Sequence, residues 1–248
     1  MSRNEIERKL IKMYEAKGFG VCDICRKCRD DVINTGKDPL WFPMGAFLAG
    51  SKMGNQKIKL LIVGKAARGD LGSASEYGYG LKCGRDLYNG NNAWKSSSWA
   101  FWGYTRQIVE MVFGNSCVEN IAITNIIQCN NSLNVDTTRY STKQHCIEEL
   151  GAIKEEIRIV NPNTIVFYTA VGYYEFTRFA FDEFTEKVST RISIGKKEML
   201  WQEGAGIIDG AFINTLCTGH PERMNKREYT NAVVEWIKRV NSCDIDIP

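Results

Sequence analysis

Five cysteines in two groups have the spacing of metal ligands. Cys22, Cys25 and Cys28 are separated by two residues each, and Cys129 and Cys146 lie in the middle of the chain. Thiolates two residues apart can bind one metal centre from a single turn, and four thiolates complete a tetrahedral zinc site or an iron–sulfur cluster. The pattern therefore predicts a metal centre that includes members of the first group. A redox pair is disfavoured, since no thioredoxin-like βαβ context surrounds these cysteines.

The cysteine content also indicates a reducing environment. The chain has nine cysteines in 248 residues, an odd number, and it opens with a charged amphipathic segment instead of a secretory signal. We therefore expect reduced cysteines in a cytoplasmic protein and no disulfide framework. The remaining cysteines are interpreted as small buried hydrophobic residues: Cys83, Cys117, Cys217 and Cys243.

Composition permits a soluble protein with a nucleic-acid partner. Hydrophobic residues make up 44% of the chain and charged residues 25%, and the formal net charge is +3. This mild basicity allows a nucleic-acid partner without demanding one. No apolar run approaches the ~20 residues of a membrane span, so we expect no membrane partner. We expect one monomeric domain, residues 1–248, with a long inserted loop at about 65–100.

Strands and helices alternate along the chain. Their order predicts an α/β protein, a three-layer sandwich with a mostly parallel central sheet and helices on both faces. Ligands bind at the carboxyl ends of the strands in such sheets, which directs attention to the segments after Val63, around Asn125 and after Cys217. Strands are expected at 58–63, 119–127, 163–169, 188–201 and 206–217, and helices at 3–17, 101–113, 141–160, 171–186 and 226–240.

The order of these motifs resembles that of the iron–sulfur uracil-DNA glycosylases. A strand ends in Thr124-Asn125, Cys129 follows four residues after the Asn, and Cys146 comes after a gap similar to the family's. Residues 64–70 stand where the family has Gly-Glu-x-Pro-Gly, and residues 218–224 are similar to its His-Pro-Ser motif and the wedge loop after it. The resemblance covers about residues 20–240 and implies a uracil-DNA glycosylase-like fold.

The resemblance implies a cofactor and a reaction. The cofactor is a [4Fe-4S] cluster bound by Cys129, Cys146 and two of Cys22, Cys25 and Cys28; the pairs Cys22/Cys25 and Cys25/Cys28 both fit. The reaction is hydrolysis of the N-glycosidic bond of a base flipped out of DNA, which leaves an abasic site. The partner is therefore DNA.

The resemblance also assigns roles to residues near the strand ends. Asn125 can offer a donor and an acceptor to the edge of a base, although an Asn in a turn is the plainer interpretation. His220 would donate to the charge that gathers on the leaving base. Gly64 and Ala66 line the base pocket, and Phe101 stacks on the base, with Trp102, Tyr77 and Tyr79 as rivals. Met224 would be the wedge, with Arg223 and Lys226 on phosphates.

Two departures from the family pattern concern water activation and the substrate. Lys65 stands in place of the family's water-polarising Glu, and Asp70 is the nearest carboxylate that could orient water, although it is equally well a solvated loop residue. The stretch before Phe101 is also much longer than the family's. We therefore expect a modified base, such as a bulky hypermodified phage cytosine, over plain uracil, with a role in antiviral defence. The alternatives are a non-catalytic iron–sulfur nucleic-acid-binding relative and an unrelated iron–sulfur or zinc enzyme.

Overall fold

A seven-stranded sheet forms the centre of the molecule. The computed structural model describes residues 1–34, 41–46, 48–67, 81, 94, 99–130, 138–169, 171–222 and 224–242. Within these residues the strand order is β2-β4-β3-β6-β9-β8-β7, and a separate antiparallel pair joins β1 (Phe42–Pro43) to β5 (Cys129–Asn130). The strands of the large sheet are β2 (Leu48–Ala49), β3 (Leu60–Gly64), β4 (Ile121–Asn125), β6 (Thr164–Phe167), β7 (Glu183–Ile194), β8 (Lys197–Ile208) and β9 (Ala211–Thr218).

The four central strands are parallel and the edges are antiparallel. β4, β3, β6 and β9 run in one direction, whereas β2 and β8 run in the opposite direction. All five residues of β3 and of β4 are buried, as expected for strands covered on both faces. The prediction of an α/β protein with a mostly parallel mixed sheet is thus confirmed.

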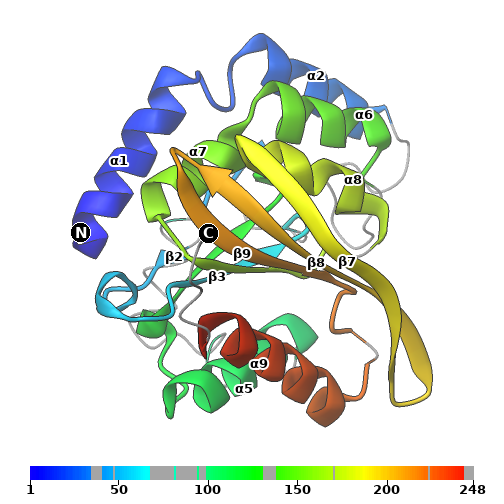
Figure 1. Cartoon of the computed structure of the whole chain (residues 1–248). Coiled ribbons are helices and arrows are strands. Elements are labelled where there is room, and N and C mark those ends of the chain that lie inside the picture. The colour runs from blue at the N-terminus through cyan, green and yellow to red at the C-terminus, as the bar shows by residue number, and fades with distance from the viewer. Residues whose placement is uncertain are drawn as a thin grey trace.

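Helices cover both faces of the sheet (Figure 1). On one face lie α1 (Arg3–Ala16), α2 (Asp23–Ile33), α6 (Tyr140–Lys143), α7 (Ala152–Val160) and α8 (Tyr174–Thr177), and on the other lie α5 (Ala100–Phe113) and α9 (Lys226–Ser242). Successive residues of β3 alternate between the two cores, with Leu61 and Val63 in the first and Leu60 and Ile62 in the second. None of the helices in the described residues is long and apolar enough to cross a membrane.

Three predicted elements differ from the structure. The helix expected at 141–160 is interrupted by a π-helical turn at Gln144–Glu149 and by Gly151, whose positive φ of 61° ends the turn before α7 begins. The single strand expected at 188–201 contains a chain reversal at Gly195, so it contributes to both β7 and β8.

The third difference has an equally local cause. The helix expected at 171–186 is a series of short turns that ends at Ala180, because residues from Glu183 onward pair with β8. Between the first expected helix and the first expected strand, the structure adds the regular helix α2, which carries Cys25 and Cys28. Most of the stretch expected as an inserted loop at 65–100 lies outside the described residues, although Leu81 and Trp94 within it are buried.

Candidate functional site

The carboxyl ends of the parallel strands bring the predicted site residues to one edge of the sheet. Gly64 ends β3 and is paired with Asn125, which ends β4. Thr218 ends β9, and His220 follows two residues later. Because β3, β4, β6 and β9 are parallel, these ends lie along a single edge, as the alternation of strands and helices predicted.

Asn125 is the centre of a tight group at this edge. A Cβ atom added to Gly64 would lie 2.4 Å from Asn125 Oδ1 and 3.1 Å from Phe101 Cε2. Only a glycine at position 64 therefore lets the Asn125 amide and the Phe101 ring pack this closely against the backbone. Asn125 is 7% exposed, and among the described residues none forms a hydrogen bond with its side-chain amide. The amide atoms are not among the fully buried unpartnered atoms of the described residues, so they keep hydrogen-bonding capacity for water or a ligand at this edge.

A row of aromatic rings extends from Asn125 towards His220. Phe101 meets Tyr168 edge to face at 5.8 Å, and Tyr168 meets Tyr229 at 6.0 Å. The Tyr229 hydroxyl lies 3.1 Å from the carbonyl oxygen of Gly219 and donates to it. The rings therefore form a continuous row of contacts between the Gly64 end and the Gly219 end of the candidate site.

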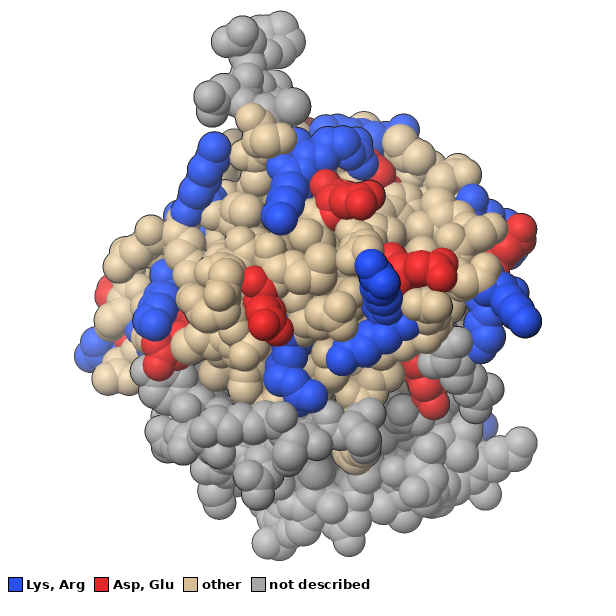
Figure 2. All heavy atoms as spheres, turned by 90° about the horizontal axis from the view of Figure 1, so that it is seen from below, with Lys and Arg blue, Asp and Glu red and all other residues tan. Residues whose placement is uncertain are grey.

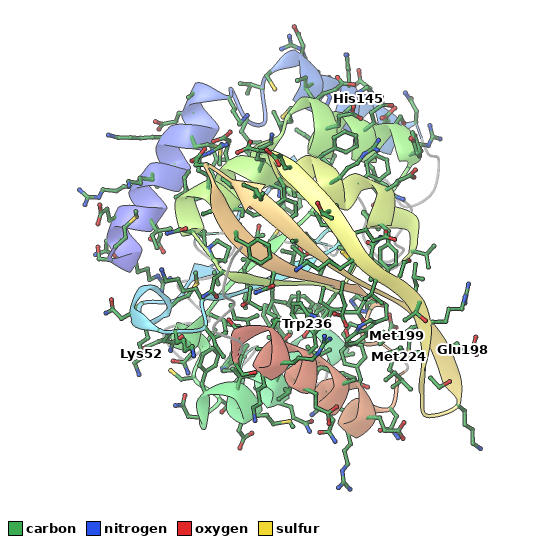
Figure 3. The ribbon with its side chains drawn as sticks, viewed as in Figure 1. Lys52, His145, Glu198, Met199, Met224 and Trp236 are labelled. Atoms are coloured by element: carbon green, nitrogen blue, oxygen red, sulfur yellow. The ribbon has the colours of Figure 1, made fainter. Side chains whose placement is uncertain are left out.

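The loop that carries His220 is held at both ends. Tyr229 binds the loop at Gly219, and the Tyr104 hydroxyl donates to the carbonyl oxygen of Met224 at 2.7 Å. Both Met199 of β8 and Met224 lie within 3.5 Å of the position of a Gly219 Cβ. Figure 3 shows Met199, Met224 and Glu198 together at the end of the β7–β8 hairpin.

His220 contacts the backbone and the carboxylate of Glu222 through Nδ1. The backbone N–H of Glu222 donates to His220 Nδ1 at 3.3 Å, so Nδ1 acts as an acceptor. When Nδ1 accepts this bond, the proton of the neutral ring is on Nε2, although the Glu222 carboxylate also lies 4.0 Å from Nδ1. A donor at this edge suits the stabilisation of negative charge on a leaving group.

Four of the five predicted cysteine ligands are buried together on the α1 and α2 side of the sheet. Cys25, Cys28, Cys129 and Cys146 are each 3% exposed or less. Cys25 and Cys28 are one helical turn apart on α2, and Cys146 lies in the π-helical turn. Cys22 is different, because it precedes α2 as its N-cap and its sulfur accepts from the Cys25 N–H.

The thiols are arranged around Cys146. Hydrogen bonds from Cys129 and Cys28 hold the pKa of Cys146 well below its usual range, and the same bonds raise the pKa of Cys28 and Cys129. Burial raises the pKa of Cys25, which also faces Cys146. Among the described residues, no group of three or more His, Cys, Asp or Glu side chains is arranged around a single metal ion. A donor set of four thiols suits an iron–sulfur cluster, whose irons are each bound by one thiolate.

A buried polar network joins the cysteines to the site edge. The Glu156 carboxylate of α7 accepts from the hydroxyls of Tyr14 and Thr124, both at 2.6 Å. The Gln128 amide donates to the Asn125 carbonyl oxygen at 2.6 Å and accepts from the Cys146 thiol at 3.7 Å. Burial raises the pKa of Glu156 to about 7, although the hydrogen bonds of its partners oppose the shift.

No protein-family model matches the chain, and no curated protein matches its sequence.

In the part of the chain that the structure describes, the other predicted site residues have no contact that bears on their predicted roles. Lys65 and Ala66 are half-buried directly after β3, where the Lys65 carbonyl accepts from the Ile127 N–H. Asp70 and Arg223 lie outside the described residues. Lys226 is exposed at the start of α9, and its ammonium lies 5.9 Å from the centre of the Tyr104 ring.

Charge on the α5 and α9 side is mixed. Figure 2 shows Lys and Arg side chains interspersed with Asp and Glu over the described part of this face, with no single basic patch.

Sequence reasoning missed four residues of the site's surroundings: Tyr104, Gln128, Glu156 and Tyr229. Only Glu156 carried a signal, because it occupies an apolar position of an amphipathic helix whose neighbours Ile153 and Ile157 are buried. The others are ordinary in sequence, and their roles come from partners far along the chain.

Proposed function

We propose that this protein is a DNA glycosylase with a uracil-DNA glycosylase-like fold, which hydrolyses the N-glycosidic bond of a flipped-out base. The observation that carries the proposal is the unpaired amide of Asn125, held nearly buried beside Gly64 and the Phe101 ring. An amide offers one donor and one acceptor group, which matches the edge of a base. A base in this position would also meet an aromatic face.

Each residue at the edge would have its own role in cleavage of the glycosidic bond. Asn125 would bind the edge of the base, and Gly64 leaves the space in which the base comes close to the backbone. As the glycosidic bond breaks, electrons move to the base and the sugar gains positive charge; His220 would donate its Nε2 proton in a hydrogen bond to the base. Water then adds to the sugar and leaves an abasic site. Asp70 and Lys65 remain the candidates for orienting that water.

The cysteine site fits a [4Fe-4S] cluster held by Cys25, Cys28, Cys129 and Cys146, and Cys22 is the least suited because it caps α2. When bound, such a cluster would tie α2 to the sheet and supply fold stability. The residues of the chain, and not the cluster, touch the proposed base.

Lys65 in place of a water-polarising Glu favours a modified base over plain uracil, and a bulky phage cytosine is the substrate that we propose. DNA of such phages would then be attacked in antiviral defence. The second candidate is a non-catalytic iron–sulfur DNA-binding relative, which the same Lys65 favours.

The test is a search for abasic sites. Purified protein is incubated with oligonucleotides that carry uracil or other bases, and with modified phage DNA, and strand breaks are measured after alkali treatment. Asn125→Ala and His220→Ala should each lower the excision rate about 100-fold or more while the melting temperature changes little. Near wild-type excision by both variants would show that the site is elsewhere. DNA binding without abasic sites would favour the non-catalytic relative.

A further inference from the structure

The β7–β8 hairpin extends past the edge of the sheet that carries the candidate site. The last pair between β8 and β9 joins Trp201 to Thr218, but β8 begins four residues earlier at Lys197. Its partner β7 continues to Ile194. Residues 191–200, here called the arm, therefore reach about 13 Å beyond Thr218, given ~3.3 Å per strand residue. Figure 1 shows this end of the hairpin projecting from the body beside the start of α9.

The arm is anchored against the loop that carries His220. Ile194 and Met199 are each 4% exposed and belong to the core under α9. The Thr218 hydroxyl donates to the Met199 sulfur at 3.4 Å. At the tip, the Gly195 N–H donates to the Glu228 carboxylate of α9 at 2.5 Å. The arm thus has a defined position next to residues 219–226, and does not hang free in solvent.

The outer surface of the arm is basic. Arg191, Lys196 and Lys197 are exposed, and in the described part of the chain no carboxylate forms an ion pair with any of them. Glu198 is the one acidic residue of the arm. Across the tip lie Asn225 and Glu228, and the exposed Lys226 and Arg227 stand between them in the sequence. Exposed cations on an anchored projection beside the candidate site are suited to a polyanion, because binding releases its counterions.

We propose that the arm binds the phosphate backbone of the DNA strand beside the flipped nucleotide, with Lys196 and Lys197 as the contacting residues. The inference rests on the proposed function for the identity of the polyanion. Its physical basis is separate, since it depends on the strand register, the anchoring of the arm and its charge. Lysine contacts of this kind position the DNA and carry no base specificity.

The experiment compares two variants that lose the same charge. Lys196→Ala/Lys197→Ala removes the lysines of the tip, and Lys9→Ala/Lys12→Ala removes two exposed lysines from α1. Binding of a fluorescent oligonucleotide is measured by anisotropy over a range of salt concentrations. The arm variant should reduce the slope of log affinity against log salt by about 1.8, that is ~0.9 for each lost phosphate contact. The α1 variant should keep the wild-type slope. Equal slopes in the two variants would overturn the proposal.

The outcomes separate the arm from the proposed reaction. If wild-type protein forms no abasic sites but the slopes still differ, the arm binds DNA and the glycosylase proposal fails. If wild-type protein excises a base and the slopes are equal, the reaction remains and the arm proposal fails. Lysines on an edge strand can also prevent pairing between molecules. Self-association of the arm variant in light scattering, with unchanged DNA affinity, would assign the lysines to that role and overturn the inference.

Discussion

The two sides of the sheet use polar groups in opposite ways. On the α1, α2 and α7 side, a central group of buried polar side chains has protein partners: Glu156 binds two hydroxyls, and the cysteine thiols hydrogen-bond one another. At the carboxyl edge, beside the row of aromatic rings that begins at Phe101, the Asn125 amide has none among the described residues. Polar groups with partners inside the protein stabilise the fold, whereas a polar group kept without one is available to a ligand. Changes on the first side should therefore alter stability, and changes at the edge should alter activity.

The largest effect is expected for Cys129→Ala. If the four buried thiols bind an iron–sulfur cluster, this variant should lose the visible absorption of the cluster, and its free energy of unfolding should fall by roughly 4 kcal/mol or more. Cys22→Ala is the control, because Cys22 only caps α2 and should cost about 1 kcal/mol. Iron content, visible absorption and chemical denaturation measure these outcomes. A colourless wild-type protein that binds only zinc and is fully active would contradict the cluster.

Gly64→Ala tests the edge directly. The added Cβ would lie 2.4 Å from Asn125 Oδ1, so the amide must move. A displacement of this kind should lower the excision rate about 100-fold, while overpacking costs roughly 1–3 kcal/mol of stability. Gly103→Ala on α5 is the matched control, since its Cβ would meet nothing closer than 3.8 Å. If both variants lost activity equally, the loss would not be specific to the contact with Asn125. Full activity in Gly64→Ala would remove Asn125 from the site.

Glu156, on the α7 side of the sheet, should make the free energy of unfolding depend on pH. Burial raises its pKa from 4.5 to about 7 in the folded protein, so the folded state binds its proton more tightly than the unfolded state does. The resulting stability is present below pH 4.5 and is lost as the pH rises to about 7, by roughly 3 kcal/mol. Glu156→Gln cannot titrate and should lack this part of the pH dependence. Urea denaturation from pH 4 to about 8 compares the two proteins; parallel curves would be inconsistent with the raised pKa.

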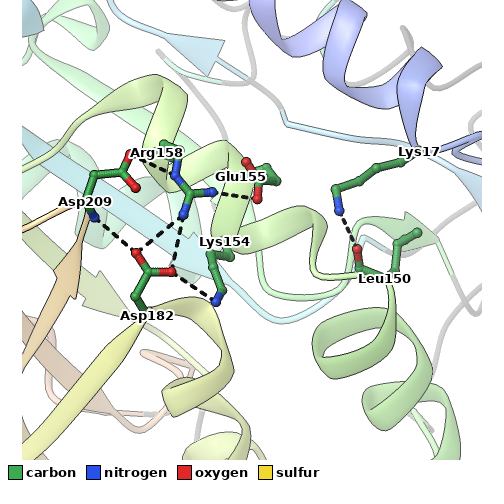
Figure 4. Close-up of polar contacts among 7 residues, drawn as sticks. All are labelled: Lys17, Leu150, Lys154, Glu155, Arg158, Asp182 and Asp209. Atoms are coloured by element: carbon green, nitrogen blue, oxygen red, sulfur yellow. Dashed lines mark hydrogen bonds and ion pairs between the residues drawn. The ribbon is translucent and has the colours of Figure 1, made fainter.

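The smallest effect is expected at the surface network around Asp182 (Figure 4). The Asp209 N–H, Lys154 and Arg158 hold the pKa of Asp182 below its usual range. This interaction therefore contributes stability above the ordinary Asp pKa, and that stability is lost as the pH falls through the lowered value. Because the Asp182 side chain is 37% exposed, Asp182→Asn should cost less than about 1 kcal/mol at neutral pH. If Asp182→Asn instead lowered the free energy of unfolding by several kcal/mol, as the loss of a buried ion pair does, solvent would not be screening these surface pairs.

Local sequence pattern predicted most of the fold. Apolar runs of four to six residues predicted β3, β4 and β6 to within a few residues, and helical periodicity predicted α1, α5 and α9. The pattern failed where a single residue reverses or interrupts the chain. Gly195 turns one predicted strand into a hairpin, and Gly151 ends a predicted long helix. A positive φ at a glycine depends on what the flanking segments pack against, which local periodicity does not contain.

The sequence by itself determined that Gly64, Asn125 and His220 stand at or just beyond strand ends, and parallel strands then place these ends at one edge. Only the tertiary structure showed that the helical register of α2 turns Cys25 and Cys28 inward and leaves Cys22 as its cap. Only the structure paired Glu156 with Tyr14, which is 142 residues away. The reason is physical: strand ends follow from local hydrophobic runs, whereas the partner of a buried polar group is set by packing between distant segments.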